Sequence, residues 1–580
     1  MARRLQERWK IRGTLEAVQP LHVGGAQTVA ETDMPLAING QGQFYVPGTS
    51  LAGVFRHWLA EVFDEDNETG GLGLSHRLFG WQATKGNSGN QASDDGWASF
   101  VLVEDGLVNL PDGVAFPQIL DSVGIDRQSG AAANGIKFDR AILPRGTTVA
   151  LEMTWEVPTP SNSHLKKDPN ETPAALGHLL SQLQEYGLQL GAGGSRGLGQ
   201  VRLHAEPIIA REDWSSRAGV LNVLKSRGKT SASPHWTPKQ LQDRLPSLKP
   251  KLPPELDVTI QWRPDGPLMS KAPFDGIAVD ALPLLSQDRD EWTMFLAGSS
   301  IKGAIRSQAE RIVRTLLGER LQMTWPDGSR NDRERHRRQV EVPLIREVFG
   351  AAAQRAANIS RETTTQAGSL RVAPCYGLNT RSRSGWNSII LADAVDPKVD
   401  FVAGATPLSQ AMSDFKPSGA VQKPRFEAAT HVAIDRWTGG AAESLLYSGF
   451  EPRHVEWDPL RLTLQWSRIP TALRHPALAL VWLLIRDLVQ NRIPLGFGST
   501  RGYGSIAVEA IQFETRGTAI DELKWWNGHR LTAGESNGVL TRDNLDKFAA
   551  SHEEAFDELQ LHWQAAIEDG LPRSTDKEPA

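Results

Sequence analysis

The two halves of this 580-residue chain repeat the same motifs in the same order, and this duplication limits the folds open to it. The clearest copy is a glycine loop, LGAGGSRGLG at residues 190–199 and LGFGSTRGYG at residues 495–504. Both fit the pattern L-G-x-G-x-x-R-G-x-G without a gap, and an alternating strand pattern follows each. The repeated unit is about half of the chain. A unit of this size is a whole domain, because the units of solenoid proteins are much shorter. The sequence therefore predicts two copies of one fold.

Three further motif pairs keep the same order in both halves. They are VPGTSLAGVFR with LAGSSIKGAIR, LFG with VFG, and GIDRQSGAAAN with AIDRWTGGAAE, at residues 46–56 with 296–306, 78–80 with 348–350, and 124–134 with 433–443. The order strand, helix, strands, helix, glycine loop, strand suits a βαββαβ unit, whose exposed sheet often binds single-stranded RNA. We expect an α+β protein of two tandem ferredoxin-like (RRM-like) domains.

Composition shifts along the chain set the expected domain boundaries. A first domain is predicted for residues 1–215 and a second for residues 255–515, separated by a linker rich in Ser, Lys and Pro at 216–254. The second half is longer, and its excess indicates an insertion around 351–430. Residues 516–580 carry apolar side chains at helical spacing and are expected to form a helical C-terminal extension.

The overall composition excludes several protein classes. A formal net charge of −5 argues against a protein that coats nucleic acid indiscriminately, although a local basic groove would be enough to hold RNA. Cys375 is the single cysteine, so an internal disulfide and a cysteine-rich zinc site are ruled out. The charged start of the chain does not resemble a secretory signal, and the longest uncharged apolar run, residues 477–485, is too short to span a bilayer. We expect a cytoplasmic protein that contacts no membrane.

The GTS and GSS turns stand before the predicted helices 51–63 and 301–317. Ser or Thr at such a position caps a helix, and the free N–H groups there attract phosphate. The candidate RNA-binding residues at these turns are Gly48, Thr49, Ser50, Arg56, Ser299, Ser300, Lys302 and Arg306. An ordinary helix cap is the alternative for either turn.

The glycine loops let the backbone approach a ligand closely, and their shared arginine can pair with a phosphate. A strand follows each loop, unlike a dinucleotide-binding loop, and the Walker ending is missing. A tight structural turn is the alternative. The candidate RNA-binding residues here are Gly193, Arg196, Gly197, Gly498, Arg501 and Gly502.

As a set, these motifs resemble the RAMP superfamily of CRISPR-associated proteins, over residues 8–512 without the linker and the insertion. The resemblance is greatest to the backbone subunit of type III effectors, the Cas-seven class, with two copies fused as in a type III-D-like complex. It implies hairpin insertions in both domains. It also implies guide CRISPR RNA, target RNA and other type III effector subunits as partners, with base pairing supplying the sequence specificity.

The resemblance further implies an aspartate, in the loop after the first strand, that cuts target RNA with Mg²⁺ or another divalent metal. The register set by Pro20 and Pro267 aligns Asp33 with Asp280, which are the candidate catalytic and metal-binding residues. Each carboxylate could hold the metal or orient a 2′-hydroxyl for attack on the adjacent phosphate. Solvated loop aspartates are the alternative, and the neighbouring rivals are Glu31, Asp275, Asp288 and Asp290.

Two Asp-Arg pairs lie where the family forms its base-displacing hairpin, and they are candidate RNA contacts: Asp126, Arg127, Asp435 and Arg436. A structural ion pair within each Asp-Arg step is the alternative. His22 has no histidine twin in the second half, where Met269 stands, and is expected to be a polar loop residue.

We therefore expect a metal-dependent endoribonuclease that acts within an assembled ribonucleoprotein complex and cuts target RNA at two sites, one in each domain. Two other functions stay open. One is a structural guide-RNA-binding subunit without catalysis. The other is a guide-processing endoribonuclease, which would use histidine rather than metal and finds no paired histidines here.

Overall fold

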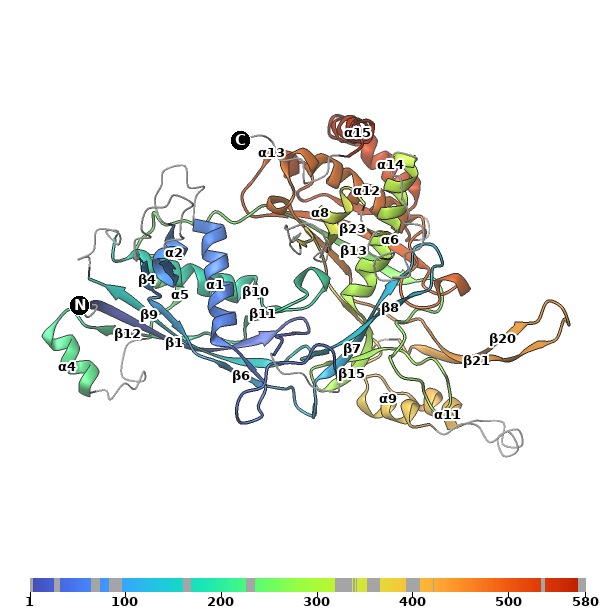
Figure 1. Ribbon diagram of the computed structural model, residues 1–580, viewed down its shortest axis with the longest axis horizontal. Helices are drawn as coiled ribbons and strands as arrows, with labels where there is room; N and C mark the ends of the chain where they lie inside the picture. Colours follow the sequence, from blue (N-terminus) through green and yellow to red (C-terminus); the bar gives the residue numbers. More distant parts are fainter. Residues whose placement is uncertain are drawn as a thin grey trace, which may run out of the picture. The chain divides into compact units, whose positions relative to one another are not determined.

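The computed structural model describes residues 4–25, 32–63, 73–82, 96–159, 168–225, 235–318, 336, 339–340, 342–351, 366–392, 407–420, 422–533 and 538–571. The chain divides into two compact units. The first consists of residues 1–117, 141–194 and 198–253, and the second of residues 118–140, 195–197 and 254–580. The second unit therefore includes a hairpin and a loop tip from the first half of the sequence (Figure 1).

The first unit is built around an antiparallel sheet in the order β10-β11-β1-β9-β6-β2, with β12 also paired to β1 and β5 to β9. The strands are β1 (Leu5–Ala17), β2 (Tyr45–Val46), β5 (Val101–Val103), β6 (Gly106–Asn109), β9 (Thr148–Pro158), β10 (Leu188–Gln189), β11 (Gln200–Leu203) and β12 (Ile208–Asp213). Alternation in β1 buries Trp9, Ile11 and Leu15 against the sheet's helices. Those helices are α1 (Gly48–Phe63) and α3 (Glu171–Glu185), whose apolar faces complete one core.

Smaller elements complete this unit and include part of the expected linker. They are α2 (Leu74–Phe79), β3 (Gly80–Gln82), β4 (Gly96–Ala98), α4 (Arg217–Lys225) and α5 (Pro238–Gln242). Residues 216–254, expected as a linker, thus contain α4 and α5. Thr237 and Gln240 close a capping box at the start of α5, which is the local reason that this Pro-rich segment becomes helical.

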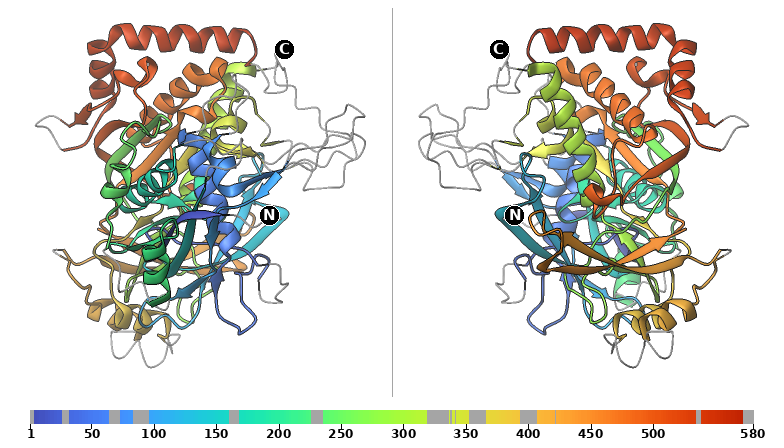
Figure 2. Two further views of the ribbon diagram at one scale, coloured as in Figure 1. Left: turned by 90° about the vertical axis from the view of Figure 1, so that its left-hand side faces the viewer. Right: turned by 90° about the vertical axis from the view of Figure 1, so that its right-hand side faces the viewer.

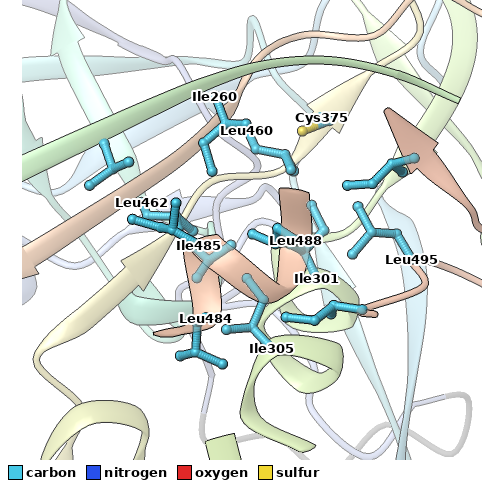
Figure 3. Close-up of a cluster of buried hydrophobic side chains, with 14 of the residues drawn as sticks. Ile260, Ile301, Ile305, Cys375, Leu460, Leu462, Leu484, Ile485, Leu488 and Leu495 are labelled. Carbon is cyan, nitrogen blue, oxygen red and sulfur yellow. The ribbon is translucent and has the colours of Figure 1, made fainter. Parts of the chain in front are cut away.

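The second unit has a sheet in the order β18-β22-β13-β23-β24. The strands are β13 (Glu255–Pro264), β18 (Leu370–Val372), β22 (Leu460–Gln465), β23 (Ile506–Arg516) and β24 (Arg530–Thr532), and the covering helices are α6 (Gly298–Leu317) and α12 (Arg474–Val489). Ile301 and Ile305 from α6 meet Leu484 and Leu488 from α12 in one core (Figure 3). Cys375 lies in the same core, where burial raises the pKa of its thiol.

The expected insertion around 351–430 contributes several short elements to the second unit. Its described parts include β17 (Gln366–Ala367), β18, β19 (Cys375–Tyr376), α9 (Arg383–Ile390), α11 (Pro407–Asp414) and the start of β20. Strands β14 (Leu285–Asp288), β15 (Glu291–Leu296) and β19 form a separate small sheet. A short helix, α8 (Ile345–Phe349), leads into β16 (Gly350–Ala351), which pairs with β17.

Two long hairpins belong to the second unit. One is β7 (Gln118–Ile125) with β8 (Ala132–Ile142), of which residues 118–140 fall in this unit, and the other is β20 (Arg425–Ile434) with β21 (Ala441–Arg453). They occupy the same place in the two sequence repeats. The hairpin β20–β21 projects from the body of the unit (Figure 1), and the side chains of its tip are mostly exposed.

The C-terminal region packs on the second unit through aromatic side chains. It contains α13 (Asp521–Lys524), β24, α14 (Arg542–Ser551) and α15 (Glu553–Glu568), the dark orange and red segments of Figure 2. Trp482 of α12 contacts Phe556 of α15 and Phe548 of α14, with ring centroids 4.8 and 5.9 Å apart. The apolar periodicity of the sequence thus becomes a packed helical face. No helix within the described ranges combines the length and the apolar character needed to cross a bilayer.

The helices that follow the GTS and GSS turns end where the sequence predicts, at Phe63 and Leu317, but they begin earlier. Both start at the glycine of the turn, Gly48 or Gly298, so the Ser and Thr residues lie inside the first turn. Ala297 is the N-cap residue of α6 and no side chain caps that end. The expectation that Ser299 or Ser300 caps this helix is therefore wrong, because the chain becomes helical before it reaches them.

Candidate nucleic-acid interface

The glycine loops have the same backbone conformation in both halves. The four glycines of each motif all have positive φ, between 77° and 89° in the first loop and between 76° and 85° in the second: Gly191, Gly193, Gly197, Gly199, Gly496, Gly498, Gly502 and Gly504. Only glycine adopts this region at little cost. The glycine spacing G-x-G-x-x-x-G-x-G is therefore explained by the turn itself, and the arginine of the motif is left unexplained by it.

The hydrogen bonds around the two loops match as well. Ala192 donates its N–H to the carbonyl of His22 at 2.9 Å, and Phe497 donates to the carbonyl of Met269 at 2.7 Å. His22 and Met269 are thus equivalent positions. The His22 side chain is buried, with Nδ1 2.7 Å from the carbonyl oxygen of Ala141, which is a structural contact.

The shared arginine has different neighbours in the two loops. Arg501 is exposed, contacts the hydroxyl of Tyr447, and lies over the rings of Tyr447 and Phe497 at 5.0 and 4.8 Å. Arg196 makes no hydrogen bond or ion pair with any residue in the described ranges, and burial lowers the pKa of its guanidinium. A desolvated arginine of this kind suits an anionic ligand.

Two further cations of the second unit, Lys302 and Arg140, lie close enough to Arg196 for its charge to affect their pKa. Lys302 is 4% exposed and donates to the carbonyl of Leu370 at 2.7 Å. Burial, aided by the charges of Arg306 and Arg196, lowers the pKa of Lys302 to about 7. Burial and the charge of Arg196 likewise lower the pKa of Arg140 to about 10. Like charges held together at such a cost indicate a place where a phosphate would be stabilised.

Some of the predicted residues at the starts of α1 and α6 already bind other residues of the protein, and others are exposed. Arg306 pairs with Glu310 at 2.7 Å and donates to the carbonyls of Gly350 and Val340. Arg56, its counterpart in α1, is exposed and has no hydrogen-bond or ion-pair partner in the described part of the chain. The N–H of Gly48 already donates to Asp105 at 2.7 Å. Thr49 and Ser299 are exposed, whereas Ser50 and Ser300 are half-buried.

Asp33 and Asp280 occupy equivalent positions in the backbone. The residue after each accepts a hydrogen bond from a strand that leaves a hairpin: Ala141 donates to Met34 at 3.1 Å and Phe450 donates to Ala281 at 3.0 Å. Both carboxylates are exposed. Asp280 accepts from the N–H and the hydroxyl of Ser448, at 2.6 and 3.1 Å, which holds it at the base of β20–β21.

The rival acids differ in environment. Glu31 lies outside the described residues. Asp275 pairs with Lys271 at 3.0 Å, and the buried Asp288 pairs with Arg381 at 2.7 Å. Asp290 is exposed in the turn between β14 and β15. Asp288 is therefore a structural ion pair.

The two predicted metal-binding aspartates stand outside the ligand clusters of the described residues. In the described ranges, neither Asp33 nor Asp280 belongs to a group of three or more His, Cys, Asp or Glu side chains close enough to share an ion. Mg²⁺ binds through one or two carboxylates together with substrate phosphates and water. Each aspartate thus suits such an ion only where RNA completes the coordination.

Asp126 and Asp435 shape the two hairpin turns. Each Oδ1 accepts from the N–H groups two and three residues further on, at 2.9 and 2.9 Å for Asp126 and at 2.7 and 3.1 Å for Asp435. The hydrogen bond from the Ser129 N–H is the main reason that the pKa of Asp126 falls to about 2. The aspartates form Asx turns. Arg127 forms its ion pair with Glu310 and not with the neighbouring Asp126, which was the alternative.

The surroundings of the hairpin tips are different. In β7–β8, Arg127 Nε lies 2.6 Å from Glu310, and Gln339 donates to Asp126 at 2.9 Å. In β20–β21, Arg436 has no hydrogen-bond or ion-pair partner in the described residues, and Trp437 is 95% exposed. The second hairpin thus presents an unpartnered cation beside an exposed aromatic ring.

The sequence reasoning missed an aromatic group at the base of β20–β21. His431 and Tyr447 are paired across the hairpin and their rings stack, with centroids 5.1 Å apart and planes at 22°. The Tyr503 hydroxyl donates to Glu451 at 2.8 Å. Burial, with this hydrogen bond, raises the pKa of Tyr503. Counting back from the Asx turn would not have found this pair, because a register shift between Val432 and Ile434 moves the partner of His431 to Tyr447.

A profile described as the RAMP superfamily matches residues 14–202 and 285–507. A comparison with curated proteins returns no match. The two matched regions fall one in each half of the chain, as the repeated motifs do, and together they cover more than half of it. The protein therefore belongs to the RAMP superfamily, as a tandem pair.

Proposed function

We propose that this protein is a backbone subunit of a type III CRISPR RNA-guided effector complex, of the Cas-seven class. In this proposal it binds guide RNA and cleaves complementary target RNA at Asp33 and Asp280. The observation that carries the proposal is that both exposed carboxylates follow the same hydrogen-bonding register beside the base of a hairpin.

The arrangement of elements supports a ferredoxin-like RAMP domain in each half. In chain order, the second half runs β13, α6, β18, β22, α12, β23, and in space its strands lie in the order fourth, first, third, second. The first half has the same order, with β11, β1, β9 and then β5 and β6. This order agrees with a βαββαβ unit, in which two helices cover one face of the sheet.

Two kinds of side chain support RNA binding. Arg196, Arg140 and Lys302 supply positive charge at partly buried positions, where a phosphate backbone would be attracted. Tyr447 and His431, with Arg501 over the tyrosine ring, form a platform of the type on which unpaired bases stack.

The cleavage chemistry would depend on the RNA as much as on the protein. An exposed carboxylate can accept a hydrogen bond from a 2′-hydroxyl and orient it toward the adjacent phosphate. A divalent ion, bound by the same carboxylate and RNA phosphates, would stabilise charge on the phosphate oxygens. Since one carboxylate is a small catalytic set, the bent geometry of the bound strand must supply much of the rate.

The test is the cleavage ladder of labelled target RNA in the assembled complex with Mg²⁺. We expect Asp33→Ala to remove one group of products, Asp280→Ala to remove another, and the double variant to remove both, with guide RNA retained in each. Asp290→Ala, an exposed acid in a nearby turn of the second unit, is the matched control and should leave the ladder unchanged. An identical ladder from wild type and the double variant would contradict the proposed catalytic role.

A structural guide-RNA-binding subunit without catalysis is the second candidate. It is favoured because, among the described residues, neither Asp33 nor Asp280 belongs to a group of three or more potential metal ligands. The same assay separates the two, because a purely structural subunit binds the guide and the target duplex without metal-dependent cutting. A guide-processing endoribonuclease has less support, since the buried His22 corresponds to Met269; cutting of precursor guide RNA by this chain in EDTA would favour it.

A further inference from the structure

Three potential metal ligands meet where the C-terminal helix packs on α12. His475 stands in the first turn of α12, and Glu558 and His562 stand on α15. Glu558 and His562 are four residues apart, so they share one face of their helix. The contact between Trp482 and Phe556 holds the two helices together beside them.

The distances between these groups are too long for hydrogen bonds. Glu558 Oε1 lies 3.5 Å from Nε2 of His475 and 4.0 Å from Nε2 of His562. None of the three side chains forms a hydrogen bond with another residue in the described ranges. Three polar groups thus point toward one another without bonding directly.

The same distances are close to those of a metal site. The three ligand atoms all lie within 4.8 Å of one another. In a tetrahedral zinc site with bonds of about 2.0–2.1 Å, ligand atoms are roughly 3.4 Å apart. The imidazole rings, with centroids 4.3 Å apart and planes at 19°, need only splay for their Nε2 atoms to converge on one ion.

His475 is the least exposed of the three side chains, at 21%, and this partial burial lowers the pKa of its imidazole. The side chains of Glu558 and His562 are 58% and 47% exposed, so an ion can reach the site from solvent.

We propose that His475, Glu558 and His562 form a site for a transition-metal dication, zinc above all, which clamps α15 to α12. Two imidazoles and one carboxylate are a zinc ligand set, and water can take the fourth position. Mg²⁺ avoids nitrogen ligands, so this site is chemically distinct from any magnesium site at Asp33 or Asp280. The clamp is independent of the proposed RNA cleavage.

The test uses the full-length protein, stripped with EDTA and titrated with ZnCl₂ by calorimetry. We expect one zinc ion per chain at this site, and a rise in Tm of roughly 3–8 °C at a 100-fold excess over Kd. His475→Ala and His562→Ala should each weaken binding by about tenfold or more, which is the loss already seen when only the outer partner of a ligand is removed. MgCl₂ should produce neither effect.

A matched control is available in the first unit. His204 is an exposed histidine 3.0 Å from Glu16, and among the described residues this pair belongs to no group of three potential ligands, so His204→Ala should bind zinc as wild type does. Both ligand variants are tested for native Tm without metal, so that loss of binding is not confused with loss of fold. Equal zinc affinity in wild type, His475→Ala and His562→Ala, or no zinc binding by the wild type, would overturn the proposal.

Discussion

Two glycines in the second loop differ in what a larger residue would cost. At both positions the backbone conformation would be strained, and at one of them a Cβ atom would also clash with its neighbours. Gly496 and Gly502 have nearly the same φ, 82° and 84°. A Cβ on Gly496 would stand 2.4 Å from the carbonyl oxygen of Met269, whereas a Cβ on Gly502 would meet no described atom within 4 Å. Both positions are strained for other residues, but only Gly496 also lacks space.

Alanine at these two positions should therefore destabilise the protein unequally. We expect Gly502→Ala to lower the free energy of unfolding by about 1–2 kcal/mol, the cost of the left-handed conformation. Gly496→Ala should cost about 3 kcal/mol or more, since the loop must also move away from Met269. Urea unfolding followed by tryptophan fluorescence measures both, and equal losses would show that the close approach is not rigid.

Lys302 gives a prediction about pH. Its folded pKa of about 7 lies below the ordinary value of 10.5, so the unfolded state binds more protons between these two values. Stability should therefore increase from about pH 7 toward pH 10, with this lysine contributing at most about 1.4 kcal/mol per pH unit. Lys302→Met should remove that contribution, and Lys271→Met, at an exposed ion pair, should not. Denaturant midpoints across this range are the measurement; parallel profiles for wild type and Lys302→Met would contradict it.

At the scale of elements, the two hairpins show that equivalent positions of the sequence repeat can make different tertiary contacts. Both turns are shaped by an aspartate two residues before the tip, and this local geometry follows from the sequence. The contacts beyond the turn do not repeat, because α6 presents Glu310 to Arg127 while Arg436 meets no described partner. Local turn chemistry and tertiary docking are therefore separable.

This contrast supplies a matched pair of substitutions. Glu310 is 2% exposed and is shared by Arg127 and Arg306, so Arg127→Ala should leave a buried carboxylate with one partner fewer. We expect a loss of about 1–3 kcal/mol in unfolding free energy. Arg436→Ala, at the equivalent place in β20–β21, should change it by less than about 0.5 kcal/mol. If both variants unfold at the same denaturant concentration, the Arg127 contact does not stabilise the unit.

At the scale of the whole molecule, features that repeat in the sequence were predictable and features that arise from tertiary contact were not. The glycine loops, the helix ends at Phe63 and Leu317, and the alignment of Asp33 with Asp280 follow from matched motifs. The cation group around Lys302 and the meeting of His475 with His562 depend on residues far apart in the chain. The repeated motifs point to Arg196 and Lys302 one by one, but they do not show that these residues meet, and His475 and His562 belong to no repeated motif.

The composite make-up of the second unit has a consequence for how such a chain can be divided. Its folded body draws on residues 118–140 and 195–197 as well as on everything after residue 253. In two separately encoded halves, Glu310 would lose Arg127 and the Gln339 side chain would lose Asp126 until the matching fragment arrived from solution. Covalent fusion replaces that bimolecular encounter with a high effective concentration and fixes the stoichiometry at one to one.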